Sequence, residues 1–263
     1  MMRVCLFSLW LVLAAALVAA QNSTEPQIII GVGLPKSGST SLNRYLNNCG
    51  AGIRSIHFTS SCVRSVYPIP AVRVNGVIWG ALEVPELAGR LRGQQCTIAA
   101  LFQRALADGR KPLEYVLERN VNAVVQLDSD LGQMAVYPQI DALDIILDSY
   151  PNALYIHHIR NVSRHAASII GWHDMAQRMQ ERGTLGRFPG QNENKTVEEN
   201  LVVWIETARD IVRSEFADRP EIKYLEVDIE GDAGASRKLA AFVGATKGMD
   251  VPRANARKST IKT

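Results

Sequence analysis

The stretch QIIIGVGLPKSGSTS, residues Gln27–Ser41, determines the fold class expected for this chain. It begins with a short apolar run that ends in glycines, as is typical of a strand buried on both faces of a parallel sheet. After a turn, apolar residues recur at helical spacing over 39–48, and Gly50 lies where a C-terminal helix cap is expected. The stretch therefore predicts a buried strand, a tight loop and a helix.

The alternation of strand and helix continues along the rest of the chain. Short apolar runs predict strands, and helical periodicity or capping residues predict helices, as at the capping box Thr196–Glu199. The expected strands cover 123–127, 153–159 and 223–227, and the expected helices cover 138–150, 163–182, 197–216 and 235–243. This order predicts an α/β fold, a doubly wound parallel sheet with flanking helices. The stretch 51–93, rich in Pro and Gly, is expected to form loops.

The N-terminus has the layout of a signal peptide. Arg3 precedes a nearly uninterrupted apolar run, Val4–Ala20, and the sequence becomes polar at Gln21. Cleavage after residue 20 is expected, and the alternative is an uncut type II anchor, because the run would only just span a bilayer. The chain is therefore expected to enter the secretory pathway, with 21–263 as a single domain. Contact with a membrane is expected only if the segment remains uncleaved.

The charge balance gives no sign of a polyanionic partner. The chain has 29 basic and 26 acidic residues, a formal net charge of +3. This near-neutral balance is typical of an enzyme and gives no reason to expect nucleic acid or an anionic membrane surface as a partner. Only the C-terminal tail is locally basic, at Arg253, Arg257, Lys258 and Lys262, and such tails are usually solvated.

Three cysteines follow the expected cleavage site, namely Cys49, Cys62 and Cys96. An oxidising lumen permits one disulfide among them and leaves one thiol over, and the spacing does not decide which pair forms. A metal site is not expected, because no two cysteines are close in sequence and no histidine pair completes a ligand set.

The loop Gly33–Ser41 has the position of a phosphate-binding loop. It joins the first strand to its helix, so that backbone N–H groups and the helix N-terminus converge where an anion can bind. In the loops that bind ATP or GTP, a lysine directly follows the second glycine of G-x-x-x-x-G-K-[ST]. Here Ser39 occupies that position, and Lys36 lies inside the loop. The nucleotide-triphosphate motif is therefore not matched.

The run PKSGST, Pro35–Thr40, resembles the P-K-S-G-T-T phosphosulfate loop of the sulfotransferases that use 3′-phosphoadenosine 5′-phosphosulfate (PAPS). The resemblance implies a P-loop NTPase-like sulfotransferase fold and PAPS as the donor, with no metal required. Lys36 would stabilise charge on the leaving 5′-phosphate without a magnesium bridge. The residues that would surround the 5′ end are Lys36, Ser37, Gly38, Ser39, Thr40 and Ser41. Without the resemblance, the loop would be a glycine-containing turn with a solvated lysine.

A second motif, YIHHIRNVSRHAAS at Tyr155–Ser168, resembles the 3′-phosphate site of the same family. In that family a strand ends in Arg, commonly R-[DN]-P, and a Ser eight residues later joins it on the 3′-phosphate. Arg160 and Ser168 match that spacing, whereas Val162 replaces the usual proline. An arginine at the carboxyl end of a parallel strand can grip a phosphate bidentately. The other interpretation is an arginine paired with an acid.

The acceptor hydroxyl must lose its proton during transfer, so a general base is expected near the phosphosulfate. His57 is one candidate because it lies just beyond the helix that follows the loop. Asp128 and Asp130 are the others, because they end a predicted strand at the same edge of the sheet. The alternatives are a loop histidine in a polar setting, and aspartates that cap a helix or pair with Arg160. Of His157 and His158, which alternate along a strand, at least one is expected only to pack.

These observations favour transfer of the sulfuryl group of PAPS to a hydroxyl, with a carbohydrate expected as acceptor because the chain enters the secretory pathway, in the Golgi or outside the cell. The acceptor pocket is expected in the loops 51–93 and 183–194. One alternative is a P-loop kinase or nucleotide hydrolase, which the misplaced lysine and the lack of a clear apolar-run-plus-Asp magnesium site oppose. The other is a non-catalytic secreted binding protein on the same fold.

Glycosylation sequons begin at Asn22, Asn161 and Asn194. The first and third are expected on polar loops, where secretory entry would make them glycan sites. Asn161 adjoins the expected 3′-phosphate site and is therefore expected to be buried and unglycosylated.

Overall fold

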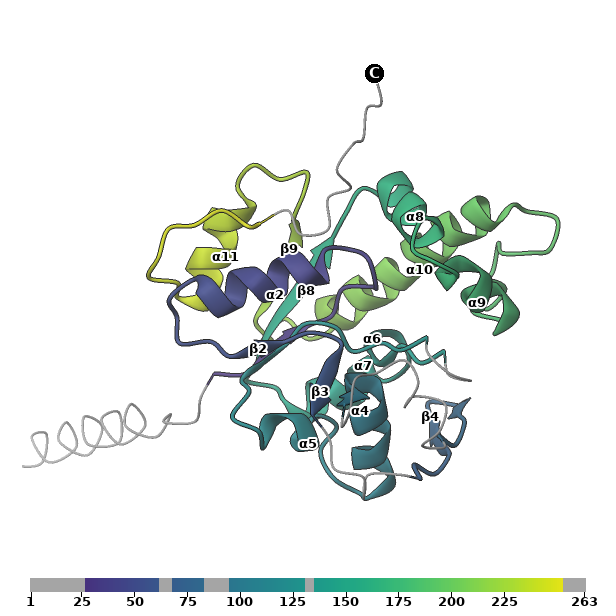
Figure 1. The fold of residues 1–263 in the computed structure, drawn as a ribbon, viewed down its shortest axis with the longest axis horizontal. Helices are drawn as coiled ribbons and strands as arrows, with labels where there is room; N and C mark the ends of the chain where they lie inside the picture. Colours follow the sequence, from purple (N-terminus) through teal and green to yellow (C-terminus); the bar gives the residue numbers. More distant parts are fainter. Residues whose placement is uncertain (1–26, 62–67, 83–94, 131–134, 253–263) are drawn as a thin grey trace, which may run out of the picture.

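The computed structural model describes residues 27–61, 68–82, 95–130 and 135–252 (Figure 1). The expected signal segment 1–20, Cys62 and the basic tail from Arg253 lie outside the described residues. In chain order the elements are β1 (Ile29–Gly31), α2 (Ser39–Asn48), β2 (Ser55–Ile56), β3 (Thr59–Ser61), β4 (Val72–Val74), β5 (Val77–Trp79), β6 (Gln95–Thr97), α4 (Ile98–Ala107), α5 (Glu114–Leu117), β7 (Ala123–Val124), α6 (Pro138–Asp141), α7 (Leu143–Ser149), β8 (Leu154–Ile159), α8 (Val162–Ile170), α9 (Met175–Glu181), α10 (Val197–Ala217), β9 (Tyr224–Asp228) and α11 (Ala235–Val243).

A five-stranded parallel sheet forms the centre, in the order β2-β7-β1-β8-β9. Its middle strand is β1, where Ile29 lies opposite Ala123 of β7 and Leu154 of β8. All three residues of β1 are buried, as expected for a strand covered on both faces. Because the strands are parallel, the segments that follow β1, β2, β7 and β8 all begin at the same edge of the sheet.

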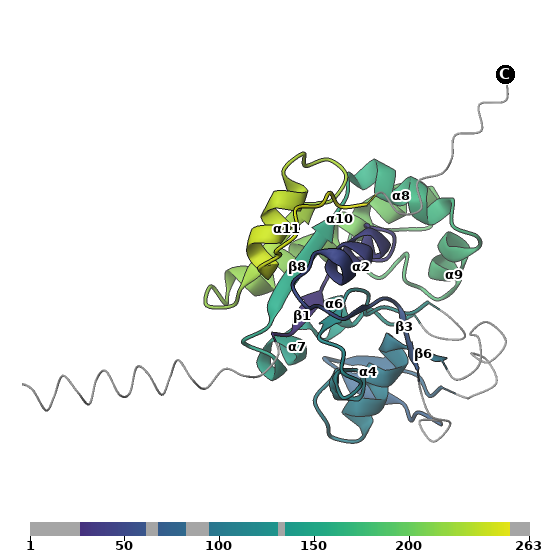
Figure 2. The ribbon, with the colours of Figure 1, turned by 60° about the vertical axis from the view of Figure 1, so that its left-hand side comes forward.

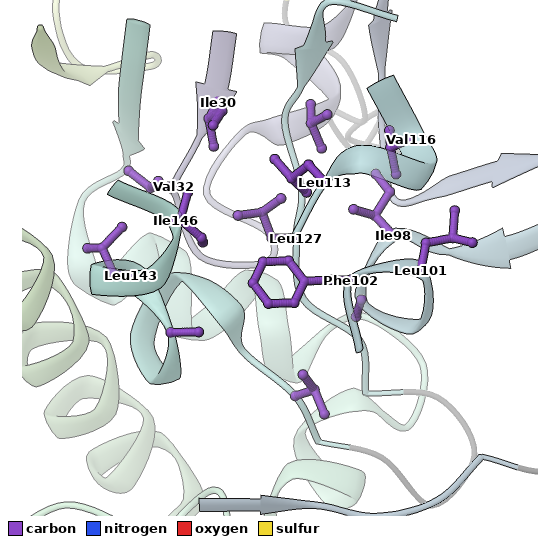
Figure 3. Packing of buried hydrophobic residues seen from close by; sticks show 14 of the residues in the cluster. Ile30, Val32, Ile98, Leu101, Phe102, Leu113, Val116, Leu127, Leu143 and Ile146 are labelled. Carbon is purple, nitrogen blue, oxygen red and sulfur yellow. The ribbon is translucent and has the colours of Figure 1, made fainter. Parts of the chain in front are cut away.

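Helices cover both faces of this sheet. On one face α2 and α11 pack against alternate strand residues such as Ile29 and Val227. On the other face α4, α7 and the C-terminal part of α10 pack against Ile30 and Tyr155. Figure 3 shows this second cluster around Phe102, and Figure 2 shows α2 and α11 together at one end of the view with α4 at the other. The expected α/β fold with a helix-flanked parallel sheet is therefore confirmed.

The connections around β1 diverge. The chain leaves β1 through α2 on one face, whereas it leaves the neighbouring strands β7 and β8 toward α7 and α10 on the other face. In open α/β sheets, ligands bind outside the carboxyl ends of the strands where neighbouring connections part in this way. The loop after β1 therefore lies at the expected ligand-binding edge.

Several predicted helices match the structure, and two do not. The structure confirms α2, α11 and α10, and both hydrogen bonds of the capping box at Thr196 are present. The single helix predicted over 138–150 is wrong, because Ala142, with φ of −139°, separates α6 from α7. The helix predicted over 163–182 is also divided, because α8 ends at Ile170 and His173 has a left-handed φ of 50° before α9.

The region predicted as loops contains short strands. Within 51–93, β2 joins the main sheet, β3 pairs with β6, and β4 pairs with β5. The buried helix α4, which the sequence analysis did not predict, is capped by Thr97, whose Oγ1 accepts a hydrogen bond from the Ala100 N–H at 3.1 Å. Figure 1 shows β3, β4 and α4 lying together in the lower part of the view, below α6 and α7.

Cysteine usage agrees with the expected single disulfide and leftover thiol. Cys96 is disulfide-bonded, and Cys49 is a buried free thiol. Across the described ranges, no helix combines the length and apolar character needed to cross a membrane.

Candidate functional site

The loop after β1 is a tight turn whose shape depends on glycine. A Cβ atom at Gly33 would lie 2.5 Å from the ring and backbone oxygen of His158, so no side chain fits there. Gly38 precedes α2 with φ of 114°, a conformation that side chains rarely adopt. The Ser37 hydroxyl and N–H both donate to the Leu34 carbonyl, at 2.5 and 3.2 Å, which closes the turn. The loop backbone is therefore held at the N-terminus of α2, where anions bind.

Lys36 projects from this loop as an unneutralised cation. Its backbone is left-handed, with φ of 67°, and its Nζ atom lies 3.3 Å from the centroid of the Trp172 ring. Among the described residues no carboxylate forms an ion pair with it. Burial, and secondly the charge of Arg160, lower the pKa of Lys36 to about 8. A cation held without a counter-ion at a phosphate-type loop is suited to bind an anion.

His57 contacts the first turn of α2. It follows β2, and its Nε2 atom lies 2.9 Å from the Ser39 hydroxyl and 3.5 Å from the Thr40 hydroxyl. Ser39 donates its proton to Oε1 of Gln126 at 3.0 Å, so we assign the Nε2 proton to His57 as the donor to Ser39. Burial lowers the pKa of His57 to about 4, and the nearby Lys36 charge acts in the same direction. The imidazole is therefore neutral at physiological pH.

The assigned tautomer fixes which ring nitrogen carries the lone pair. With the proton on Nε2, this is Nδ1 of His57. A neutral imidazole beside the phosphate-type loop is a candidate general base.

Asp128 is buried beneath this arrangement. Its side chain accepts hydrogen bonds from the amides of Gln126 at 3.1 Å and Gln139 at 3.2 Å, and it is only 2% exposed. Burial, with the Asp130 charge as a smaller cause, raises the pKa of Asp128 to about 7. Through Gln126 it orients the Ser39 hydroxyl, so its contacts are those of a supporting residue.

Asp130 forms an ion pair with Arg178 of α9. Its carboxylate accepts from Arg178 of α9 at 2.5 Å, and both side chains are buried. Asp130 therefore matches the alternative of a structural acid, but its partner is Arg178, and Arg160 pairs with Glu230 instead. Since Asp130 is neutralised by Arg178, His57 and Asp128 remain as candidate bases.

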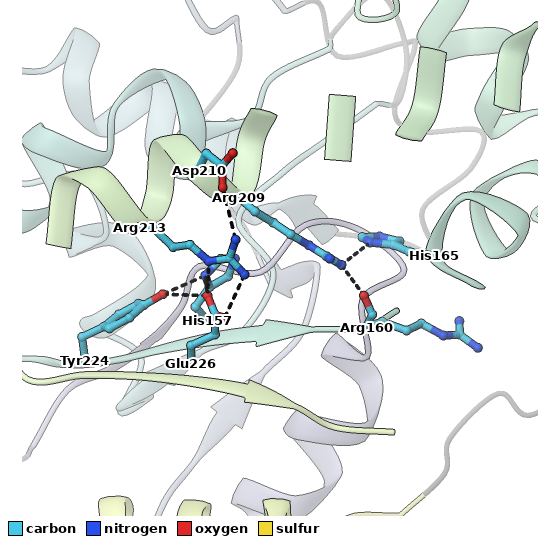
Figure 4. Close-up of polar contacts among 8 residues, drawn as sticks. All are labelled: His157, Arg160, His165, Arg209, Asp210, Arg213, Tyr224 and Glu226. Atoms are coloured by element: carbon cyan, nitrogen blue, oxygen red, sulfur yellow. Dashed lines mark hydrogen bonds and ion pairs between the residues drawn. The ribbon is translucent and has the colours of Figure 1, made fainter. Parts of the chain in front are cut away.

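Arg160 follows β8 at the same edge of the sheet. Its Nε atom lies 2.8 Å from Glu230, and both side chains are partly exposed. Figure 4 shows its side chain extending away from Arg209, which donates to the Arg160 carbonyl at 2.5 Å. Ser168 lies partly buried on α8, and no hydrogen bond joins it to Arg160 in the described part of the chain. The two expected 3′-phosphate residues are thus on adjoining elements but are not bonded to each other.

His165 fixes the loop from behind, a role that the sequence analysis missed. Its Nδ1 atom accepts from Arg209 at 3.2 Å, and its Nε2 atom donates to the Pro35 carbonyl at 2.7 Å. Burial lowers the pKa of His165 to about 3, which keeps it neutral and able to accept and donate at once. The sequence pattern that could have revealed this role is the position of His165 on the apolar face of α8, four residues before the buried Ile169.

The residue Asn161 differs from its prediction. It is exposed and caps α8, where its side-chain oxygen accepts from the Arg164 N–H at 3.2 Å. The expectation that Asn161 is buried is therefore wrong. Asn194 is exposed, as expected for a polar loop, and Asn22 lies outside the described residues.

Backbone strain gathers around the same loop. Of the five described non-glycine residues with left-handed φ, three lie here: Lys36, Phe58 directly after His57, and His173 directly after Trp172; the other two are Asn75 and Asn120. Such conformations cost about 1–3 kcal/mol each and persist at sites where geometry matters. Over the ranges that the structure describes, no group of three or more His, Cys, Asp or Glu residues is arranged to hold a metal ion.

Comparison with known proteins identifies no relative: no family model matches this chain, and no curated protein matches it. The geometry of the site is therefore the basis for a functional assignment.

His158 offers a test of the buried histidine cluster behind the loop. It is fully buried, and neither ring nitrogen makes a well-formed hydrogen bond. Burial lowers its pKa to about 3. Between this value and the unfolded value near 6.5, the unfolded state binds more protons, so the free energy of unfolding falls as the pH falls. One such histidine contributes a loss of about 2 kcal/mol between pH 7.5 and pH 5.0.

When the pH is lowered from 7.5 to 5.0, the free energy of unfolding should fall in both proteins. We expect this fall to be about 2 kcal/mol smaller in His158→Leu than in the unchanged protein. Urea unfolding at both pH values measures the two differences. Comparing each protein with itself cancels the packing change that leucine introduces, and the other buried histidines contribute equally to both. Equal acid losses in the two proteins would show that His158 is not held neutral in the fold.

Proposed function

We propose that this chain is a PAPS-dependent sulfotransferase with a P-loop sulfotransferase fold. The observation that carries the proposal is the placement of the neutral His57 imidazole 2.9 Å from Ser39, in a loop whose lysine has no acidic partner among the described residues. A cation for the leaving group and a base for the acceptor thus lie at one helix N-terminus. The order of strands and the divergent connections at β1 support binding of the donor there.

The donor would bind across two strands. Its 5′ end would lie against the loop backbone at the N-terminus of α2, because the hydroxyl protons of Ser37 and Ser39 are already donated to Leu34 and Gln126. Its 3′-phosphate would reach Arg160 at the end of the adjoining β8, with Ser168 on the next helix. Since Arg160 pairs with Glu230, the phosphate would share or replace that carboxylate.

Lys36 and His57 supply the charge stabilisation and the proton acceptor that the transfer step needs. The acceptor oxygen attacks sulfur, and the bond between sulfur and the bridging oxygen of the 5′-phosphate breaks. Charge grows on that bridging oxygen, where the Lys36 ammonium group would stabilise it. The acceptor proton would pass to the neutral imidazole of His57. We propose an alcohol of a carbohydrate in the secretory pathway as acceptor, on the basis of the N-terminal segment Val4–Ala20.

A P-loop kinase or hydrolase is the second candidate, and one observation favours it. Asp128 follows β7, the strand beside β1, and an aspartate in this position holds magnesium in nucleotide triphosphatases. This revises the expectation that the chain lacks such an acid. However, both oxygens of Asp128 accept from glutamine amides, and Ser39 replaces the lysine that follows the second glycine. A non-catalytic binding protein is less consistent with a neutral histidine near Lys36.

Ligand stabilisation separates these candidates. We expect PAP, the desulfated donor product, to raise the melting temperature of the secreted chain without magnesium, because Lys36 and Arg160 supply the positive charge themselves. ATP with magnesium should raise it far less, because ATP has no 3′-phosphate. Thermal shift titrations with each ligand, with and without EDTA, measure this. Equal shifts, or a strict magnesium requirement, would favour the kinase or hydrolase. Labelled PAPS with glycans, tyrosine peptides and small alcohols would then identify the acceptor.

A further inference from the structure

Trp172 is an exposed aromatic residue beside the phosphate-type loop, and no role was expected for it. It lies in the short connection between α8 and α9 and is 43% exposed, next to Ile170 at 42%. Its N–H donates to Ile169, and its carbonyl accepts from Met175, both at 3.1 Å. The His173 ring meets the indole edge-on, at 5.2 Å between centroids. The indole is therefore exposed to solvent but anchored through its backbone on both sides.

The ammonium group of Lys36 contacts the face of the Trp172 ring. The 3.3 Å distance from Nζ to the ring centroid is that of a close cation–π contact, for which tryptophan is the strongest natural partner. Acids near the loop are engaged elsewhere, since Glu230 pairs with Arg160 and Asp128 accepts from two amides. The ring thus takes the place that a carboxylate would occupy in an ordinary surface lysine pair.

An aromatic partner has a consequence that an acidic partner lacks. A carboxylate would neutralise the ammonium group and would repel an incoming phosphate. The indole face holds the ammonium group in place, carries no net charge, and binds it less strongly than a phosphate oxygen does in a charge-assisted hydrogen bond. An anion that enters the loop can therefore take the ammonium group from the ring.

We propose that Trp172 is a positioning residue for Lys36: it holds the ammonium group at the mouth of the loop and releases it to an anionic ligand. The identity of that ligand rests on the proposed function, but the contact between lysine and indole does not. Burial of the lysine is consistent with this arrangement, since its pKa is lowered to about 8 and its charge is retained at neutral pH.

Fluorescence quenching can be used to observe Trp172 separately from the buried tryptophans. Trp79 is 2% exposed and Trp204 is fully buried, so among the described tryptophans only Trp172 is open to a soluble quencher. We expect acrylamide to quench Trp172 more strongly in Lys36→Met than in the unchanged secreted chain, because methionine is one atom shorter than lysine and lacks the ammonium group that contacts the ring. Trp172→Phe supplies the background from the buried rings. Equal quenching in the two proteins overturns the proposal.

Adding PAP tests the release step. PAP should increase the quenching of Trp172 in the unchanged chain. Lys36→Met should lack this response even at PAP concentrations at which calorimetry shows the variant to be saturated. A PAP response that persists in Lys36→Met overturns the release. If PAP fails to bind the unchanged chain, the proposed function is wrong. The quenching comparison without PAP still tests whether Lys36 contacts Trp172.

Kinetics distinguish positioning from a purely structural role. We expect Trp172→Ala to lower kcat about 5- to 30-fold with a smaller change in the donor KM, and Trp172→Phe to keep kcat within about 3-fold, because a phenyl ring retains a cation–π face. Both variants should fold, since the side chain is largely outside the core. Unchanged kcat in Trp172→Ala, or equal losses in the two variants, contradicts the role.

Discussion

Lys36→Ala is expected to lower kcat about 100- to 1000-fold while weakening PAP binding by less than about 10-fold. The reason is that the charge opposite the ammonium group grows on the bridging oxygen only as the sulfuryl group departs. Interactions that strengthen in the transition state act on turnover, and those already complete in the ground state act on binding. Saturation kinetics with PAPS and calorimetry with PAP measure the two effects separately.

Arg160 provides the matched comparison. The 3′-phosphate is the same before and after transfer, so Arg160→Ala should weaken PAP binding by about 10- to 150-fold and should change kcat at saturating donor much less. Glu230→Gln removes the carboxylate that pairs with Arg160 at 2.8 Å, and should bind PAP at least as tightly as the unchanged chain. If Lys36→Ala merely raises the donor KM while Arg160→Ala abolishes turnover with affinity intact, the two roles are assigned wrongly.

The elements around the loop were predictable because their signals are local. The apolar run before Gly33 and the periodicity of 39–48 gave β1 and α2, and the capping box at Thr196 gave the start of α10. Hydrogen bonds within a few residues of each other determine these features, so the sequence pattern carries them. The position of Lys36 inside the loop was likewise read from the local motif, whereas its left-handed backbone was not predicted.

Contacts between distant segments were not predictable in this way. His57 was one of three candidate bases, and its contact with Ser39 depends on β2 joining the sheet beyond β7, two strands from β1. The proximity of Trp172 to Lys36 depends on the break between α8 and α9, where the periodicity suggested one continuous helix. Likewise, Arg160 meets Glu230 only because β9 lies beside β8. Each of these pairings is set by tertiary packing, which overrides local propensity.

His57→Gln is expected to reduce kcat/KM by about 100- to 10,000-fold, the contribution of a well-placed general base. Glutamine approximates the size and polarity of the imidazole, so thermal stability should be nearly unchanged and serves as the folding control. Asp128→Asn should cause a smaller loss, because the asparagine oxygen can still accept one of the two amide hydrogen bonds. Losses of the reverse order would identify Asp128 as the base.

The pH dependence of kcat/KM separates the two candidates independently, because it reports the pKa of the base in the free enzyme. A base acts only when deprotonated, so activity falls as the pH drops below its pKa. Burial lowers the pKa of His57 to about 4 and raises that of Asp128 to about 7. With His57 as base, kcat/KM stays level from pH 7 to pH 5, where Lys36 keeps its charge, and falls near pH 4, whereas with Asp128 it halves near pH 7. Bound phosphosulfate adds negative charge that favours the imidazolium form, so the acid limb of kcat should lie at a higher pH than that of kcat/KM. An acid limb of kcat/KM near pH 7 that moves in Asp128→Asn would exclude His57 as the base.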